Sequence, residues 1–359
     1  MLLNIPTVNT SEAIDLIVAA SKVRNMGHDS SFTGMPVLLL GEAGCGKTYA
    51  PTAAAKITEA QFAEVPAMSL SPSDATGSKA LPVHGQHDPD YVVQLFPDYV
   101  KNLDRNKPAI IVYDEGTKPP LATRNALLQI FHSRRAGRFE LGRDWMLVMT
   151  GNVASAKAGD TDNPSPFRSR VATFMVRNSC QQWLDNFAIP NNLHYSVTSF
   201  IKHHAGNPQF DKYHAGPLST WDPTENPAAY GCERSWTNLA NVADSGVDPK
   251  LLASAMIGNE LGNLYCQHLD TLAEITDFDL IKREPATAPV PDDIMICHYI
   301  GNMVAYWADR ASMDAIATYL RRMPAECAVV AMTEIATRHP DCKETRAYID
   351  FRLEYKLSL

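Results

Sequence analysis

The stretch Met35–Thr48, MPVLLLGEAGCGKT, carries the pattern that decides the fold of this chain. An apolar run, Met35–Leu40, leads into a glycine-rich segment that ends in Lys-Thr, and a helix-favouring segment, Tyr49–Ala60, follows. A buried strand, a glycine-rich turn and a helix N-terminus together make a P-loop, whose backbone N–H groups surround phosphate oxygens. The sequence therefore predicts a phosphate-binding loop in an α/β fold.

Eight residues form this predicted Walker A loop: Gly41, Glu42, Ala43, Gly44, Cys45, Gly46, Lys47 and Thr48. Glycines allow the backbone to approach phosphate oxygens closely. Lys47 is expected to reach the β- and γ-phosphates of ATP, and the Thr48 hydroxyl to hold Mg²⁺. The alternative is a glycine-rich turn with a surface lysine. The strand before the loop and the helix after it favour nucleotide binding.

A second apolar run, Ala109–Glu115 with the sequence AIIVYDE, predicts a strand that is buried on both faces. Asp114 and Glu115 stand at its carboxyl end, where ligands of parallel sheets bind. We expect Asp114 to hold Mg²⁺ through water, and Glu115 to orient and deprotonate the attacking water. A strand that ends in two solvated acids is the alternative, and the preceding P-loop makes the Walker B interpretation the better one.

A third run, Trp145–Asn152 with the sequence WMLVMTGN, predicts another buried strand. Asn152 lies just past its apolar part and is placed to hydrogen-bond the γ-phosphate or the attacking water. The alternative is an asparagine that only forms the turn after Gly151.

Arginines gather in two places after the second strand. Four lie around a predicted helix end and short hairpin: Arg134, Arg135, Arg138 and Arg143. They are either a solvated turn or a group that contacts an acidic partner or a nucleic acid backbone. Two more, Arg168 and Arg170, precede the apolar end of the run Ser165–Val176, where an isolated subunit would carry them on its surface.

The composition is that of an ordinary soluble globular protein. The chain has 359 residues, 45% hydrophobic and 20% charged, with a formal net charge of −8. An acidic balance argues against wholesale nucleic acid binding. Seven cysteines without a CxxC pair argue against a disulfide framework or a zinc ribbon, and a cluster of histidines (His194, His203, His204 and His214) fits no zinc pattern. No stretch has the length of a membrane span, so we expect a cytoplasmic protein.

Along the chain, strand-like runs give way to helical patterns from about residue 181. Before this point, we expect a second short strand at Phe62–Leu70 and helices at 10–24, 92–103 and 121–133. Beyond it, the predicted helices are 197–204, 235–244, 251–272, 293–307, 311–322, 325–337 and 343–356. A Pro-rich linker lies at 284–292. We expect three domains: an α/β core at 1–180, a helical domain at 181–284 and a C-terminal helical extension at 285–359.

The order of these motifs resembles that of an AAA+ ATPase over most of residues 1–275. In detail it is similar to the MoxR-type branch, which includes small phage-encoded relatives. Four stretches carry this likeness: MPVLLLGEAGCGKT, DEGTKPPLATRNALLQIF, RFELGRDWMLVMTGN and GCERSWTNLANVAD. The resemblance implies a P-loop NTPase sheet flanked by helices, followed by an all-α lid.

The same resemblance implies roles for particular residues. Asn152 would be sensor 1, Arg234 would be sensor 2 in the lid, and Arg170 would be the arginine finger, with Arg168 as the alternative. Val171 stands where many relatives have Phe. A finger acts on the nucleotide of a neighbouring subunit, so the resemblance also implies a ring, expected to be a hexamer.

Three functions remain open from the sequence. The leading one is an ATPase ring that remodels a protein partner in a chaperone-like way, and in the resembled family that partner often has a von Willebrand factor A domain. The second is a nucleic-acid motor, for example in phage DNA handling. The third is a nucleotide-gated scaffold with little hydrolysis, against which Glu115 and the finger candidate argue.

Overall fold

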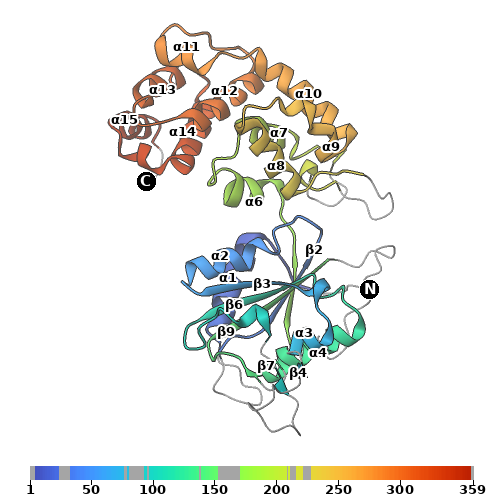
Figure 1. Cartoon of the computed structure of the whole chain (residues 1–359). Coiled ribbons are helices and arrows are strands. Elements are labelled where there is room, and N and C mark those ends of the chain that lie inside the picture. Colours follow the sequence, from blue (N-terminus) through green and yellow to red (C-terminus); the bar gives the residue numbers. More distant parts are fainter. Residues whose placement is uncertain are drawn as a thin grey trace. The chain divides into compact units, whose positions relative to one another are not determined.

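The computed structural model divides the chain into two compact units, Met1–Asn178 and Ser179–Leu359. Each unit is described here by itself (Figure 1). The residues that the structure describes are 5–23, 33–76, 79–80, 93–94, 97–136, 139–152, 170–207, 209–210, 216–220 and 228–356.

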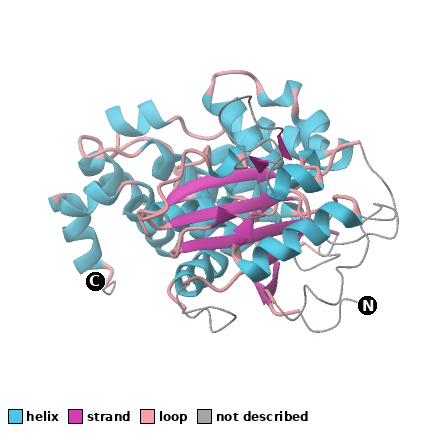
Figure 2. Ribbon diagram, turned by 60° about the horizontal axis from the view of Figure 1, so that its bottom comes forward, coloured by secondary structure: helices cyan, strands magenta, loops and turns pink. Residues whose placement is uncertain are grey.

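A six-stranded, entirely parallel sheet forms the centre of the first unit. In spatial order the strands are β1 (Thr7–Val8), β10 (Ala172–Val176), β2 (Val37–Gly41), β9 (Trp145–Asn152), β6 (Ala109–Asp114) and β3 (Gln61–Pro66). The three strands β2, β9 and β6 are buried along almost their whole length, as near-continuous apolar runs require. Figure 2 shows strands of this sheet side by side with helices over them.

Helices cover both faces of the sheet because alternate strand residues point to opposite sides. On one face α1 (Thr10–Ser21) and α2 (Tyr49–Ile57) bury Ile17 and Ala54 against Leu39 and Val148. On the other face α3 (Pro72–Thr76) and α4 (Leu121–Ser133) pack over a cluster that includes Tyr113 and Leu147. The predicted fold class, a P-loop sheet flanked by helices and followed by further helices, is confirmed.

Two small antiparallel ladders accompany the main sheet. One joins β4 (Lys79–Ala80) to β5 (Val93–Gln94), and the other is the hairpin of β7 (Arg135–Ala136) and β8 (Phe139–Glu140). The helix predicted at 92–103 is wrong. The described residues there form β5 and a single 3-10 turn, Asp98–Val100, after Pro97.

The second unit is helical in all of its described regular elements. Its first half contains α6 (Cys180–Trp183), a π-helical turn (Leu184–Ala188), α7 (Tyr195–His204), α8 (Glu233–Asp244), α9 (Ala253–Ile257) and α10 (Asn259–Ala273). Its second half contains α11 (Phe278–Arg283), α12 (Ile294–Trp307), α13 (Met313–Leu320), α14 (Ala325–Arg338) and α15 (Arg346–Glu354). The single helix predicted at 251–272 is wrong, because Gly258, with φ of 89°, separates α9 from α10.

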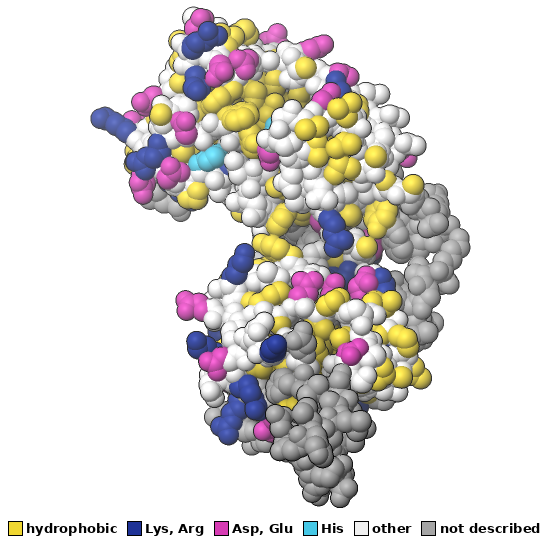
Figure 3. Space-filling model, viewed as in Figure 1, with side chains coloured by type: hydrophobic (Ala, Val, Ile, Leu, Met, Phe, Trp, Pro, Cys, Tyr) yellow, Lys and Arg dark blue, Asp and Glu magenta, His cyan; other side chains and the backbone are white. Residues whose placement is uncertain are grey.

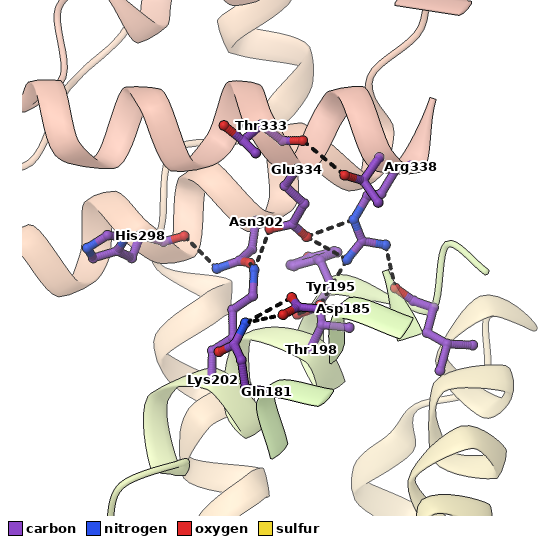
Figure 4. A network of polar contacts seen from close by, with 12 residues as sticks. Gln181, Asp185, Tyr195, Thr198, Lys202, His298, Asn302, Thr333, Glu334 and Arg338 are labelled. Carbon is purple, nitrogen blue, oxygen red and sulfur yellow. Dashed lines mark hydrogen bonds and ion pairs between the residues drawn. The ribbon is translucent and has the colours of Figure 1, made fainter. Parts of the chain in front are cut away.

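Each half of the second unit has its own apolar cluster, one around Phe200 and Trp236 and one around Ile300 and Met332. A polar network joins the two halves (Figure 4). We call it the α14 cluster, and its members are Thr198, Lys202, Asn302, Glu334 and Arg338. The Arg338 guanidinium donates to Glu334 at 2.8 Å and to Thr198 at 3.0 Å. Lys202 donates to Asn302 and Glu334, so α7 is bound to α12 and α14.

Candidate active site

The glycine-rich loop follows β2 and leads directly into α2. Gly44 and Gly46 have φ values of 84° and 86°, a left-handed conformation that glycine adopts without strain. A β-carbon on Gly41 would lie 2.7 Å from both the Val176 carbonyl oxygen and Cys45 Sγ. The loop is therefore a tight turn that only glycines allow, at the N-terminus of a nine-residue helix whose dipole favours an anion.

The Lys47 side chain lies within this turn. Its Nζ donates to the carbonyl oxygens of Gly41 at 3.1 Å and Glu42 at 2.5 Å, and the residue is 8% exposed. The amine is thus held inside the loop, at the place where a phosphate-binding lysine is needed.

Thr48 joins the loop to β6. Its Oγ1 donates to Asp114 Oδ1 at 3.0 Å, although the two residues are 66 positions apart. Thr48 makes no side-chain cap for α2, so its hydroxyl serves this contact. A hydroxyl and a carboxylate oxygen side by side are the hard donors that Mg²⁺ prefers, so these two residues fit the ion.

Thr150, which the sequence analysis did not select, is part of the same group. Its hydroxyl donates to Asp114 Oδ1 at 2.5 Å and accepts from the Glu115 N–H at 3.0 Å. The sequence contained a feature that could have identified Thr150 as a site residue. It is a polar residue in an apolar strand and lies two residues before Asn152, on the same face. We call Thr48, Asp114, Glu115 and Thr150 the sheet-edge cluster.

Glu115 is the first residue after β6 and has φ of 54°. This conformation is uncommon for a non-glycine residue and is found more often at functional sites. Its carboxylate is 43% exposed and accepts from Lys118 Nζ at 2.6 Å. Glu115 therefore keeps a partly solvated carboxylate, while its backbone N–H joins it to Thr150 and so to Asp114.

Asn152 ends β9 exactly opposite the first residue of the loop, because the parallel register pairs Gly41 with Asn152. The same register pairs Gly41 with Val176 on the other side. The ends of β2, β9 and β10 therefore meet at one edge of the sheet, with the glycine-rich loop between them.

The arginine candidates belong to different parts of the chain. Arg170 is exposed and precedes β10, at the end of the strand away from the loop. Val176 lies six positions after Arg170, which is about 20 Å for an extended chain. Arg168 lies outside the described residues. Arg234 is exposed in the first turn of α8, in the second unit, and its sensor 2 role stays a prediction.

Arg134 differs from the arginines with which the sequence grouped it. It ends α4 in a left-handed conformation and is 2% exposed. Its guanidinium donates to the carbonyl oxygens of Trp145 at 2.6 Å and Gly34, and burial lowers its pKa to about 10. Arg134 therefore stabilises the end of α4 and is not available to contact an acidic partner or a nucleic acid backbone. Arg135 is exposed and pairs with Glu140 at 3.3 Å, and Arg138 lies outside the described residues.

The other His, Cys, Asp and Glu side chains of the described residues form no metal site. In the described ranges, no three His, Cys, Asp or Glu side chains are grouped as a metal site requires. His203 and His204 contact aromatic rings, and none of the seven cysteines, all of which lie in the described ranges, forms a disulfide. None of the helices in the described part of the chain combines the length and apolarity that a membrane crossing needs.

Comparison with known proteins gives likenesses of structure only. No protein-family model and no curated protein matches the chain. The RuvB Holliday junction branch migration motor of Thermotoga maritima is 12% identical with a TM-score of 0.38, over 98% of this chain and 88% of that one. A putative ATPase from Cytophaga hutchinsonii is 12% identical with a TM-score of 0.33, over 99% and 91%. A full-length MCM homolog from Methanopyrus kandleri is 11% identical with a TM-score of 0.31, over 46% and 33%.

Proposed function

We propose that this chain is a Mg²⁺-dependent ATPase with its site at the carboxyl edge of the parallel sheet. The observation that carries this proposal is the 3.0 Å contact between Thr48 Oγ1 and Asp114 Oδ1. It brings the last residue of a P-loop pattern together with the acidic end of the second buried strand. A glycine-rich surface turn beside two unrelated solvated acids would not require this contact.

Each residue of the proposed site has its own role in phosphoryl transfer. The loop N–H groups and Lys47 would bind the phosphates, and Thr48 and Asp114 would hold Mg²⁺, which would supply positive charge against the phosphate oxygens. Glu115, which directly follows Asp114 and keeps a partly solvated carboxylate, would accept a proton from the attacking water. Asn152, level with Gly41, donates to the γ-phosphate or orients the water.

The position of Arg170 supports the proposal of a ring. A side chain about 20 Å away along β10 does not reach the loop of its own subunit. If Arg170 is the finger, it therefore acts on the nucleotide of a neighbouring subunit. We propose a homo-oligomeric ring, most simply the hexamer that the resembled family implies.

The work done by the ring is proposed to be the remodelling of a protein partner, with a von Willebrand factor A domain as the candidate partner from the resemblance. On the face shown in Figure 3, described Lys and Arg side chains are interspersed with Asp and Glu. A nucleic-acid motor needs a more continuous basic surface. Turnover stimulated by DNA would favour the motor instead.

Mixing two inactive variants tests the site and the ring together. Glu115→Gln lacks the base and keeps the finger, whereas Arg170→Ala lacks the finger and keeps the base. Each alone should bind ATP and lose turnover, by about 10²–10⁴-fold for the base and about 10³–10⁵-fold for the finger. A mixture should regain activity, because some interfaces then combine an intact base with an intact finger.

Arg135→Ala is the matched control, since it removes an exposed arginine of the same unit and should turn over like the wild type. Turnover per subunit of the wild type should also rise with protein concentration across the micromolar range. Wild-type activity in Arg170→Ala would refute the finger, and ATP binding without any turnover of the wild type would favour the scaffold.

A further inference from the structure

Three segments meet behind the glycine-rich loop. The register of the sheet pairs Val8 with Val176 and Val176 with Gly41. Thr10 and Asn178 each lie two residues beyond a paired valine, so both reach the edge of the sheet at which the loop begins. They come from opposite ends of the first unit, 168 residues apart.

Four hydrogen bonds join these segments. Asn178 Oδ1 accepts from the Thr10 N–H at 2.8 Å, and Asn178 Nδ2 donates to Thr10 Oγ1 at 2.9 Å. The Cys45 carbonyl oxygen, in the middle of the loop, accepts from Thr10 Oγ1 at 3.3 Å and from Asn178 Nδ2 at 3.4 Å. We call Thr10, Asn178 and the Cys45 carbonyl the loop clasp.

The clasp is built into the fold. Asn178 is 5% exposed, and a buried amide is costly unless it is hydrogen-bonded. A β-carbon on Gly46 would lie 2.8 Å from Thr10 Oγ1, so the loop backbone packs directly on the clasp. Asn9, which precedes Thr10, caps α1 with a reciprocal contact to Glu12, and this fixes the position of Thr10.

A second contact restrains the same loop from the same strand end. Arg177 Nη2 lies 3.6 Å from Glu42 Oε1. Residues at the exit of β10 therefore contact both the beginning and the middle of the loop. Ser179, which follows Asn178, caps α6 and is the first residue of the second unit.

We propose that Thr10 and Asn178 are positioning residues of the phosphate-binding loop, a role that rests on the proposed nucleotide site. A carbonyl held by two donors fixes the peptide plane between Cys45 and Gly46, and with it the direction of the Gly46 N–H. The N–H groups of the loop then keep the orientation that phosphate oxygens require, and the binding of nucleotide costs less ordering. Neither residue touches the phosphates.

The test measures loop mobility and nucleotide affinity in the same full-length variants. Asn178→Ala removes the amide, Thr10→Val removes only a hydroxyl, and Thr10→Ser restores that hydroxyl. Thr58→Val is the matched control, because its hydroxyl donates to Ala54 at the far end of α2. The readouts are hydrogen exchange of residues 41–50 without nucleotide, and the Kd for Mg–ADP.

We expect faster exchange of the loop and a Kd raised roughly fivefold in Asn178→Ala and Thr10→Val, the factor for one lost hydrogen bond of average strength. Thr10→Ser and Thr58→Val should match the wild type. Unchanged exchange, or faster exchange with an unchanged Kd, would overturn the proposal. If the wild type binds no ADP, the proposed function is wrong. If hydrogen exchange of the loop is also equal in all variants, the positioning role of Thr10 and Asn178 is wrong as well.

Discussion

The sheet-edge cluster and the α14 cluster contain similar types of residue but differ in how far these residues are exposed to solvent. In the sheet-edge cluster the Glu115 side chain is 43% exposed, and its ion pair with Lys118 at 2.6 Å is partly solvated. In the α14 cluster, the Glu334 and Arg338 side chains are 4% and 0% exposed, and the groups bond to one another. Buried charges that are paired and hydrogen-bonded fix how helices meet, whereas partly solvated charges remain able to bind a ligand.

The comparison implies that equivalent substitutions have opposite consequences. Removing the exposed Glu115 carboxylate from the sheet-edge cluster should change catalysis and change stability little. Removing the Glu334 carboxylate from the α14 cluster should change stability and leave the proposed nucleotide site intact.

The largest effect is expected for Glu115→Gln. Loss of the proposed base should lower ATP turnover by about 10²–10⁴-fold. The free energy of unfolding should stay within about 1 kcal/mol of the wild type, because the ion pair with Lys118 is partly exposed and such pairs contribute little. ATP turnover and urea unfolding of the same preparation measure both values. A variant that is strongly destabilised would show that Glu115 supports the fold.

Glu334→Gln should destabilise the second unit by about 3–5 kcal/mol, because it leaves Lys202 and Arg338 without a counter-charge in a buried site. Hydrogen exchange in α12 and α14 should become faster, and exchange in β6 and β9 should not change. The affinity of the first unit for ADP should also stay the same.

Glu344→Gln is the matched control for that variant. Glu344 pairs with Arg310 at 2.6 Å, but its side chain is 72% exposed. An exposed pair contributes little, so no shift should be measurable. Equal effects of the two substitutions would remove the distinction between the clusters.

The smallest effect is expected on the stability of the second unit when the pH is lowered. Burial, and then the nearby His203 and His204, lower the pKa of His268 to about 3, and burial lowers the pKa of His194 and of His204 to about 4. The unfolded chain takes up these protons near pH 6.5, so the stability of the second unit is full above that pH and falls below it. For His268, which is 6% exposed, the loss by pH 5 is about 2 kcal/mol.

His268→Gln should remove this part of the pH dependence. Its side chain can retain a contact with Ser199, which bonds His268 Nε2 at 2.8 Å. Unfolding of α10, followed by hydrogen exchange between pH 5 and 7.5, should have a shallower slope than in the wild type. An identical slope would show that His268 does not titrate on unfolding.

Much of the first unit could be predicted because its signals are local. The runs at 35–40, 109–115 and 145–152 are apolar over consecutive residues, as strands buried on both faces must be, and each is a strand of the structure. Helices at 121–133 and 235–244 were likewise predicted from apolar periodicity and match α4 and α8 closely.

The errors arose where long-range contacts outweigh local pattern. Arg134 and Arg135 are adjacent in sequence, but the left-handed end of α4 turns one guanidinium into the protein and leaves the other in solvent. The strand β1 is only two residues long and was not predicted, since its partner β10 lies more than 160 residues away. A pattern within one segment holds no information about such a partner.

The sequence by itself determined the P-loop pattern, the existence of three buried strands and the acidic and amide residues at their ends, because glycines, apolar runs and strand-terminal polar residues act locally. Only the tertiary structure decided that Thr150 joins Thr48 and Asp114, and that Thr10 and Asn178 hold the loop. The physical reason is register. The register of the parallel strands determines which strand ends lie side by side. Hydrogen bonds then form between residues that are close in space, even where they are far apart in the sequence.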